Sequence, residues 1–214
     1  MAPRTKRGER MREALLASAR TVFEQKGFHD ARIVDITDGV PAALGTFYIY
    51  FPSKACIFKE LADAMVEDLA AFTLVREKDE PDPVARIQRS TANYIQVYRR
   101  HAGFISVFEQ VAAFNTEFRA LRRQARQLFI ARFTRGIERL QAAGAADRSL
   151  DPAIAAAALA AMTDNFAYHW LGLGEPYDED NAVATLSRLW VNALGMHVVV
   201  GAGCNDRKSR GSVV

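Results

Sequence analysis

The side chains that most often perform chemistry in proteins are few in this sequence, and their spacing lacks the motifs that such chemistry requires. The cysteines and histidines are Cys56, Cys204, His29, His101, His169 and His197. They form no C-x-x-C and no H-E-x-x-H pattern, and no G-x-S-x-G segment marks a nucleophilic serine. The G-x-G segments at 172–174 and 201–203 follow no strand-like stretch. The sequence therefore predicts no enzyme, metal or cofactor, and ordinary cysteine thiols of a reducing compartment.

Basic residues are concentrated at the N-terminal end of the chain. The 214 residues carry a formal net charge of +3, and residues 1–60 supply all of it, with ten lysines and arginines against seven acidic residues. A basic excess at one end indicates contact with a polyanion, although a solvated basic tail would give the same count. Composition thus suggests nucleic acid as a partner without deciding it.

Apolar residues recur at helical spacing along nearly the whole chain, whereas the alternation typical of strands never persists. The sequence therefore predicts an all-α fold. The expected helices span about 8–26, 33–40, 44–51, 54–75, 83–100, 103–113, 116–142, 152–170 and 179–199. Asp82, Asn115 and Asp151 are expected N-caps, as is Ser53. In the short third helix, Leu44, Phe47, Tyr48 and Phe51 are expected to face one side.

The chain has no segment long enough to cross a membrane. The longest apolar run, 152–162, is far shorter than the roughly 20 residues that a spanning helix needs. No apolar region follows the charged N-terminus as it would in a secretory signal. We therefore expect a cytoplasmic protein with no membrane partner.

The three N-terminal helices, with a tight turn between the second and third, form a helix-turn-helix unit behind a basic arm. The segments ARIVDI at 31–36 and LGTFYIYFPSK at 44–54, with the Gly27-Phe28 turn, resemble the N-terminal signature of TetR-type transcriptional regulators. The resemblance covers about residues 10–62. It implies an N-terminal DNA-binding domain, a linking helix, and a C-terminal domain that holds a small effector and forms a homodimer through the last two long helices.

The resemblance also implies which residues contact double-stranded operator DNA. The third helix would lie in the major groove, with Tyr48, Tyr50 and Lys54 on phosphates; the alternative for Tyr48 is a partly structural role. Lys54 lies at a helix N-terminus, which suits a phosphate oxygen, and Gly45 and Thr46 are small enough for close approach to bases. The predicted DNA contacts are Arg32, Gly45, Thr46, Tyr48, Ile49, Tyr50 and Lys54.

Three departures from the family pattern bear on DNA binding. Ala31 stands where a threonine is usual, which removes a capping hydroxyl and a phosphate donor. Val40-Pro41-Ala42 replaces the common Ala-Gly-Val turn. Ile49 stands where a basic residue is frequent and could contact thymine methyl groups, so an altered sequence preference is expected, with weaker affinity as the alternative.

Aromatic residues of the C-terminal helices are candidates for a ligand pocket, and a purely structural core is the alternative for most of them. The predicted ligand-binding residues are Tyr94, Tyr98, Phe104, Phe108, Phe129, Phe133, Asn165, Phe166, His169 and Trp170. Aromatics with a few polar groups, among which Asp164 also counts, suit an apolar or amphipathic small molecule. Arg119, Arg122, Arg123 and Arg126 form a basic face that is either solvated or meets an anionic head group.

We expect a domain boundary after the helix-turn-helix. The predicted parts are 1–53 for DNA binding, 54–201 for effector binding and dimerisation, with the linking helix at 54–75, and a flexible tail at 202–214. The hypothesis is a repressor that its ligand releases from DNA. Two alternatives stay open: a helical carrier or enzyme with a vestigial helix-turn-helix, and an activator or co-regulator that acts through protein contacts.

Overall fold

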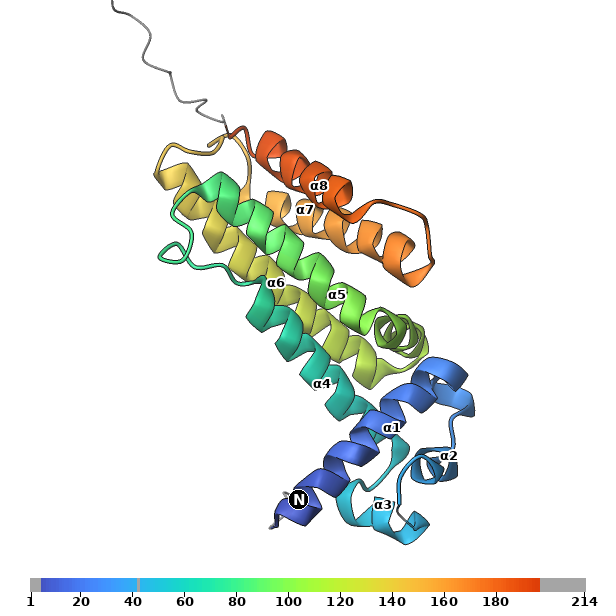
Figure 1. Cartoon of the computed structure of the whole chain (residues 1–214). Coiled ribbons are helices and arrows are strands. Elements are labelled where there is room, and N and C mark those ends of the chain that lie inside the picture. The colour runs from blue at the N-terminus through green and yellow to red at the C-terminus, as the bar shows by residue number, and fades with distance from the viewer. Residues whose placement is uncertain (1–4, 42, 197–214) are drawn as a thin grey trace, which may run out of the picture.

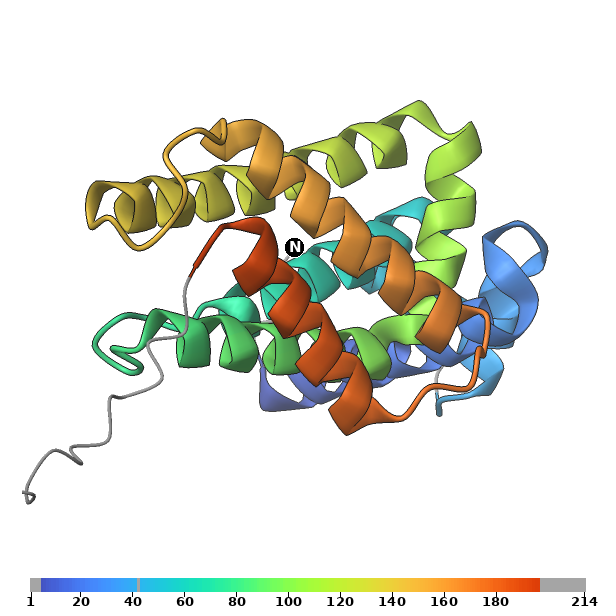
Figure 2. The same ribbon diagram turned by 90° about the horizontal axis from the view of Figure 1, so that it is seen from above.

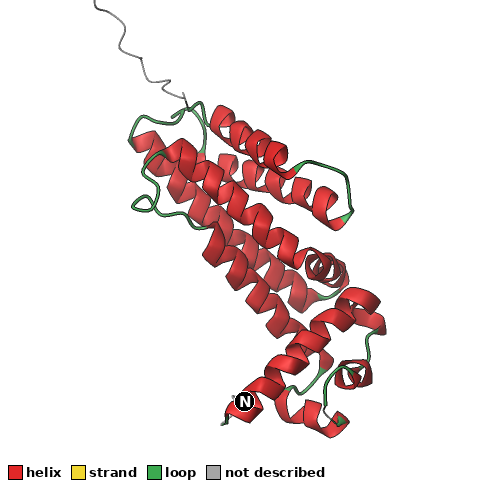
Figure 3. Cartoon of the chain, viewed as in Figure 1, coloured by secondary structure: helices red, strands yellow, loops and turns green. Residues whose placement is uncertain are grey.

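The computed structural model describes residues 5–41 and 43–196, which form helices and contain no strand (Figure 3). The N-terminal helices are α1 (Lys6–Asp30), α2 (Ile33–Asp38), α3 (Leu44–Tyr50) and α4 (Lys54–Thr73). The others are α5 (Pro83–Phe114), α6 (Thr116–Ala142), α7 (Pro152–Ala167), the π-helical turn η1 (Tyr168–Gly172) and α8 (Glu179–Ala193). The all-α prediction is confirmed. Residues 1–4 of the predicted arm and the predicted tail at 202–214 lie outside the described residues.

The helices form a small unit at one end of an elongated bundle (Figure 1). Helices α1, α2 and α3 pack on one another, and α4 leads from them into the bundle beside α5 and α6. Helix α7 packs on α6 and α8 packs on α5, so that α7 and α8 form an outer layer. No helix in the described ranges is both long and apolar enough to cross a bilayer.

The predicted N-caps start their helices as expected. The carboxylates of Asp82 and Asp151 accept from main-chain amides one turn on, at 2.9 Å from the nitrogens of Ala85 and Ile154. The Asn115 amide oxygen and the Ser53 hydroxyl do the same for α6 and α4. These bonds satisfy amides that have no partner within the helix.

Several helix boundaries differ from the sequence-based expectation. Helix α5 is continuous where helices at 83–100 and 103–113 were expected, and Figure 2 shows its last part turning across the bundle. Gly103 stays helical because α1 packs against it, with Glu24 Cδ 3.2 Å from the position of an added Cβ. The first helical run ends at Gly27 as expected, because its φ of 74° is not helical, and a further turn within α1 runs on to Asp30. Helix α7 continues into η1, and α8 ends at Ala193. Residues 197–199 of the expected last helix lie outside the described ranges.

The expected inward face of the third helix was wrong for two of its four residues. Phe47 and Phe51 are buried, whereas Leu44 and Tyr48 are 47% and 54% exposed. A seven-residue helix on the surface of the unit buries only a narrow strip, here the i, i+4 pair. Of the other α3 residues, Gly45 and Ile49 are exposed, Thr46 is partly buried, and Tyr50 is partly buried and packs against the core.

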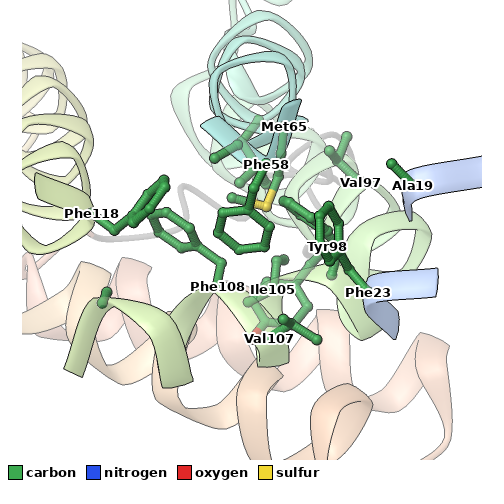
Figure 4. Close-up of a cluster of buried hydrophobic side chains, with 14 of the residues drawn as sticks. Ala19, Phe23, Phe58, Met65, Val97, Tyr98, Ile105, Val107, Phe108 and Phe118 are labelled. Carbon is green, nitrogen blue, oxygen red and sulfur yellow. The ribbon is translucent and has the colours of Figure 1, made fainter. Parts of the chain in front are cut away.

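One aromatic core joins the N-terminal unit to the bundle (Figure 4). Phe58 of α4 is fully buried at its centre, with ring centroids 5.1 Å from Phe23 of α1, 5.0 Å from Phe104 of α5 and 5.1 Å from Phe118 of α6. A second cluster around Trp190 fills the far end of the bundle. The expected boundary at 53/54 stays a prediction, and the first cluster extends on both sides of it.

Candidate nucleic-acid interface and ligand pocket

The outer face of α3 carries side chains that the fold leaves uncovered. Ile49 is 71% exposed and Tyr48 54%, while Thr46 and Tyr50 are partly exposed. A Cβ built on Gly45 would meet no atom within 4 Å, so the main chain there is open to an approaching surface. The buried Phe47 fixes the opposite side of the helix. The structure thus brings the five predicted α3 residues together on one short helix.

Arg32 lies at the N-cap of α2 with its side chain 73% exposed. Its main-chain amide donates to Asp35 Oδ2 at 2.9 Å, and Lys26 Nζ of α1 lies 3.0 Å from Asp35 Oδ1. The amide hydrogen bond, and then the Lys26 ammonium, hold the pKa of Asp35 at about 2, below its ordinary 3.8. Asp35 therefore caps α2 and fixes it to α1, while the Arg32 guanidinium stays accessible.

Ala31 does not occupy the capping position that its place in the family pattern suggested, because the N-cap of α2 is Arg32. Its methyl group is buried, and Asp35 serves the start of α2 in place of a hydroxyl. Helix α2 is further held by Ser18 of α1, whose hydroxyl donates to the Ile36 carbonyl at 2.7 Å. Gly39 packs so closely on Ser18 that a Cβ there would clash. Sequence reasoning missed this Ser18–Gly39 contact, because glycine spacing alone does not show what packs against it.

The Lys54 ammonium is directed into the protein. It donates to the carbonyls of Phe28, His29 and Ala31 at 2.6, 2.9 and 2.7 Å, and lies 4.8 Å from the Phe28 ring centroid. An ammonium has three hydrogens, so all of its donors are used. Burial lowers the pKa of Lys54. The main-chain amide of Lys54, in the first turn of α4, is the donor left for an outside partner.

A pocket of about 990 Å³ lies within the bundle, between α4, α5, α6 and the ends of α7 and α8. Five predicted ligand residues line it: Tyr94, Tyr98, Phe108, Phe129 and Phe133. Sequence reasoning missed other lining residues, including Met65, Leu69, Thr163 and Trp190. The α4 residues were assigned only to a linking helix, and no pattern in the sequence shows that α4 forms a wall. The volume is at the upper end of that of small-molecule sites.

The other five predicted ligand residues lie outside this pocket. Phe104 packs in the aromatic core, and the buried Trp170 lies beneath the Arg99 guanidinium at 5.2 Å. Phe166 packs on Tyr177 between α7 and α8. Asn165 and His169 are exposed, and His169 Nδ1 lies 3.5 Å from Glu175 Oε1. In that stretch Thr163 and Asp164 line the pocket, whereas Asn165, Phe166 and His169 do not.

Polar groups gather at one end of the pocket. Tyr94 donates its hydroxyl to Asp164 Oδ1 at 2.7 Å, and burial, together with the Asp164 carboxylate, raises the pKa of Tyr94 and of Tyr98. Glu109 accepts from Arg122 Nε at 2.7 Å, and burial raises the pKa of Glu109. Arg119, Arg122, Arg123 and Arg126 all line the pocket, so the basic face of α6 is part of its wall. In residues 5–41 and 43–196, no three histidine, cysteine or acidic side chains gather as metal ligands would.

Two families match successive parts of the chain. Residues 15–61 match the family described as "Bacterial regulatory proteins, tetR family", and residues 87–195 match "Transcriptional regulator EthR, C-terminal domain". The HTH-type transcriptional regulator EthR of Mycolicibacterium smegmatis is 25% identical over 196 residues, which are 91% of this chain and 90% of that protein. EthR of Mycobacterium tuberculosis strain H37Rv is 26% identical over 184 residues, 85% of each chain.

Solved structures show the same fold at lower identity. A transcriptional regulator from Saccharomonospora viridis in complex with choline superposes with a TM-score of 0.74 at 19% identity, covering 86% of this chain and 96% of that one. The fatty acid degradation regulator FadR from Bacillus halodurans gives 0.73 at 16% identity, covering 87% and 97%.

Proposed function

Because the chain belongs to the TetR family of transcriptional regulators, and so is a DNA-binding regulator and not an enzyme, we propose that it acts as a repressor that a ligand releases from DNA. In this proposal a ligand-free homodimer binds operator DNA, and a small, largely apolar or amphipathic molecule in the pocket favours a dimer geometry that fits the operator less well. The observation that carries the proposal is the aromatic core that joins the pocket to α1.

The DNA-contacting surface of this proposal is the outer face of α3. Gly45, Thr46 and Ile49 would meet base edges in the major groove, and Tyr48 and Tyr50 would reach phosphates with their hydroxyls. Arg32 extends this surface from the start of α2, and Lys54 would contribute its main-chain amide to a phosphate. What supports this assignment is the exposure of these groups around the buried Phe47.

Coupling between ligand and DNA would pass through Phe58. Phe108 lines the pocket and packs against Phe58 with ring centroids 6.5 Å apart, and Phe58 in turn packs against Phe23 of α1. A ligand that displaces the Phe108 wall would therefore move the helix on which α2 and α3 are held. Coupling of this kind is typically worth about 1–3 kcal/mol.

A DNA-binding measurement tests the proposal. Purified protein should retard a DNA fragment from beside its own gene at moderate salt, and Gly45→Ala should weaken binding about tenfold or more, since a methyl group at a tight interface breaks close contact. Gly45→Ala should leave the fold intact, because the added methyl group meets nothing within the protein. Gly136→Ala, another open helical position, is the matched control and should bind DNA like the parent protein when no ligand is present.

The same experiments separate the alternatives. Failure to bind any duplex in dilute buffer would favour a carrier with a vestigial helix-turn-helix. Expression of the neighbouring gene should rise on deletion of the regulator, whereas a fall would indicate an activator.

A further inference from the structure

We propose that the ligand of the pocket is an anionic amphiphile, an apolar chain that ends in a phosphate or carboxylate group, and that Arg123 and Arg126 bind this group. The inference rests on the proposed function only in taking this pocket as the effector site. It goes further by naming the chemical class of the ligand and the residues that select it.

The charge of the pocket wall favours an anion. Eight arginines line the pocket against three acidic residues. Such a surplus of fixed positive charge, in a cavity with low-dielectric walls, attracts a negatively charged group and disfavours a cation. Four of these arginines lie on successive turns of α6, at 119, 122, 123 and 126, and therefore along one side of the helix.

The four arginines differ in what they already bind. Arg119 donates to the carbonyls at the end of α5, at 3.3 Å to Ala112 and more closely to Ala113, and Arg122 is paired with Glu109. Arg126 makes a single long bond of 3.4 Å to the Ala157 carbonyl of α7. Arg123 has no hydrogen-bond or ion-pair partner in the part of the chain that the structure describes. Arg123 and Arg126, one turn apart, therefore keep free donors that can converge on one anionic group.

The rest of the pocket suits an extended apolar chain. Lining residues of α6 run from Arg119 to Ala143, which is roughly 36 Å at the rise of an α-helix. The apolar part of the pocket wall includes Met65, Leu69 and Ile105. Figure 4 shows Met65, Ile105 and Phe108 in the buried cluster. A charged head at the arginines would thus leave the chain among apolar side chains, where burial of each methylene is favourable.

The carboxylates near the arginines do not cancel them. Glu109 is already paired with Arg122, and Asp164 accepts the Tyr94 hydroxyl. Tyr94, Tyr98 and Asp164 offer the aromatic rings and the carboxylate that a quaternary ammonium group would need. A cationic chain is therefore the contrary case that the experiment must include.

Ligand binding can be measured on the full chain without DNA. Trp190 lines the pocket, so its fluorescence should report occupancy, and isothermal titration calorimetry gives an independent affinity. The test compounds share one chain and stay below micelle-forming concentrations: dodecyl phosphate, dodecanoate, dodecanol and dodecyltrimethylammonium. Inorganic phosphate serves as the head group alone. We expect dodecyl phosphate, dodecanoate or both to bind roughly tenfold or more tightly than dodecanol, in line with one charge-assisted contact. We expect dodecyltrimethylammonium to bind least.

Substitutions assign the head group to its residues. Arg123→Gln and Arg126→Gln should each weaken the anionic chains about tenfold and leave dodecanol unchanged within about twofold. Arg135→Gln is the matched control, since Arg135 is an exposed arginine of α6 that does not line the pocket, and it should change neither affinity. Because Arg123, Arg126 and Arg135 are all exposed, near-native circular dichroism and thermal unfolding are expected for all three variants.

Three results would overturn the inference: tighter binding of the cationic or neutral chain, equal effects of Arg123→Gln and Arg135→Gln, or binding of no chain at all. Failure of the proposed function is distinguishable, because the binding assay contains no DNA. An anionic chain that binds through Arg123 and Arg126 but does not release the operator would refute ligand-controlled release and leave the ligand class standing.

Discussion

At the scale of single residues, the Lys54 ammonium joins the start of α4 to the end of α1. It satisfies three carbonyls that the last turn of α1 leaves without helical partners. We expect Lys54→Ala to lower the free energy of unfolding by about 1–3 kcal/mol, the range for charged hydrogen bonds. Urea denaturation followed by circular dichroism measures this loss. Lys59→Ala, which removes the exposed pair with Asp63 and a weaker attraction to Glu117, is the control and should cost about 1 kcal/mol or less.

The same variant tests how Lys54 meets DNA. Its side-chain donors are all used within the protein, so Lys54→Ala should leave the slope of log affinity against log salt unchanged if the contact is made by the main-chain amide. A slope that falls by about one unit would instead show that the ammonium leaves its carbonyls for a phosphate.

Asp35 should make the stability of the N-terminal unit depend on pH. The pKa of Asp35 is about 2 in the folded protein and 3.8 in an unfolded chain. The charged carboxylate therefore contributes its full stabilisation above about pH 4, and this stabilisation is lost as the pH falls toward 2. The difference in free energy of unfolding between the parent and Asp35→Asn should therefore be constant near neutral pH and shrink between about pH 4 and 2. A difference that stays flat across this range would show that the amide of Arg32 and the Lys26 ammonium do not favour the charged form.

At the scale of helices, the capped starts could be predicted from the sequence and the continuity of some helices could not. Asp82, Asn115 and Asp151 mark their helices through local hydrogen bonds, which depend only on neighbouring residues. The continuity of α5 through Gly103 depends on packing against α1, and no local pattern contains that information. The outward turn of Leu44 and Tyr48 likewise depends on how little of α3 the unit can cover.

Gly27 gives α1 the bend that brings its last turn to Lys54. Its φ of 74° and ψ of 171° lie in a region that is almost restricted to glycine. Gly27→Ala should therefore cost about 1–3 kcal/mol of stability although its Cβ would meet no atom within 4 Å. Thermal and urea unfolding measure this cost. Gly136→Ala, at an equally open but helical position, should leave the free energy of unfolding unchanged or raise it by up to about 1 kcal/mol. Equal losses of stability in the two variants would refute the strain argument.

At the scale of the whole molecule, one core serves both the N-terminal unit and the ligand pocket. The helix-turn-helix could be predicted because its residues are close in sequence. Of the ten residues predicted to line the ligand pocket, five do not line it. The sequence could not identify the true lining, since the walls come from five helices far apart in the chain. Phe104 and Trp170 are aromatic, like the true lining residues, but pack in the core between helices. Aromatic composition identifies a residue that will be covered without telling what covers it.

The outer layer of α7 and α8 is where we expect the second subunit of a homodimer. Figure 2 looks onto these helices, and no other described element lies over them. Ile154 of α7 is 70% exposed and Leu189 of α8 is 45% exposed, so the two helices of this layer each present a large apolar side chain that a second subunit would cover. A two-fold dimer through this layer would present two copies of α3, and operator binding needs them about 34–36 Å apart.

Charge placed in this layer should therefore separate the subunits and with them the two DNA contacts. We expect the double variant Ile154→Glu, Leu189→Glu to sediment as a monomer where the parent sediments as a dimer, because buried carboxylates without partners are costly. Its affinity for a two-site operator should fall at least about tenfold, since each half-site then binds alone. Leu128→Glu, at a position 64% exposed on α6, is the control and should change neither property. A dimer that survives the double substitution and still binds the operator would place the interface on another face of the bundle.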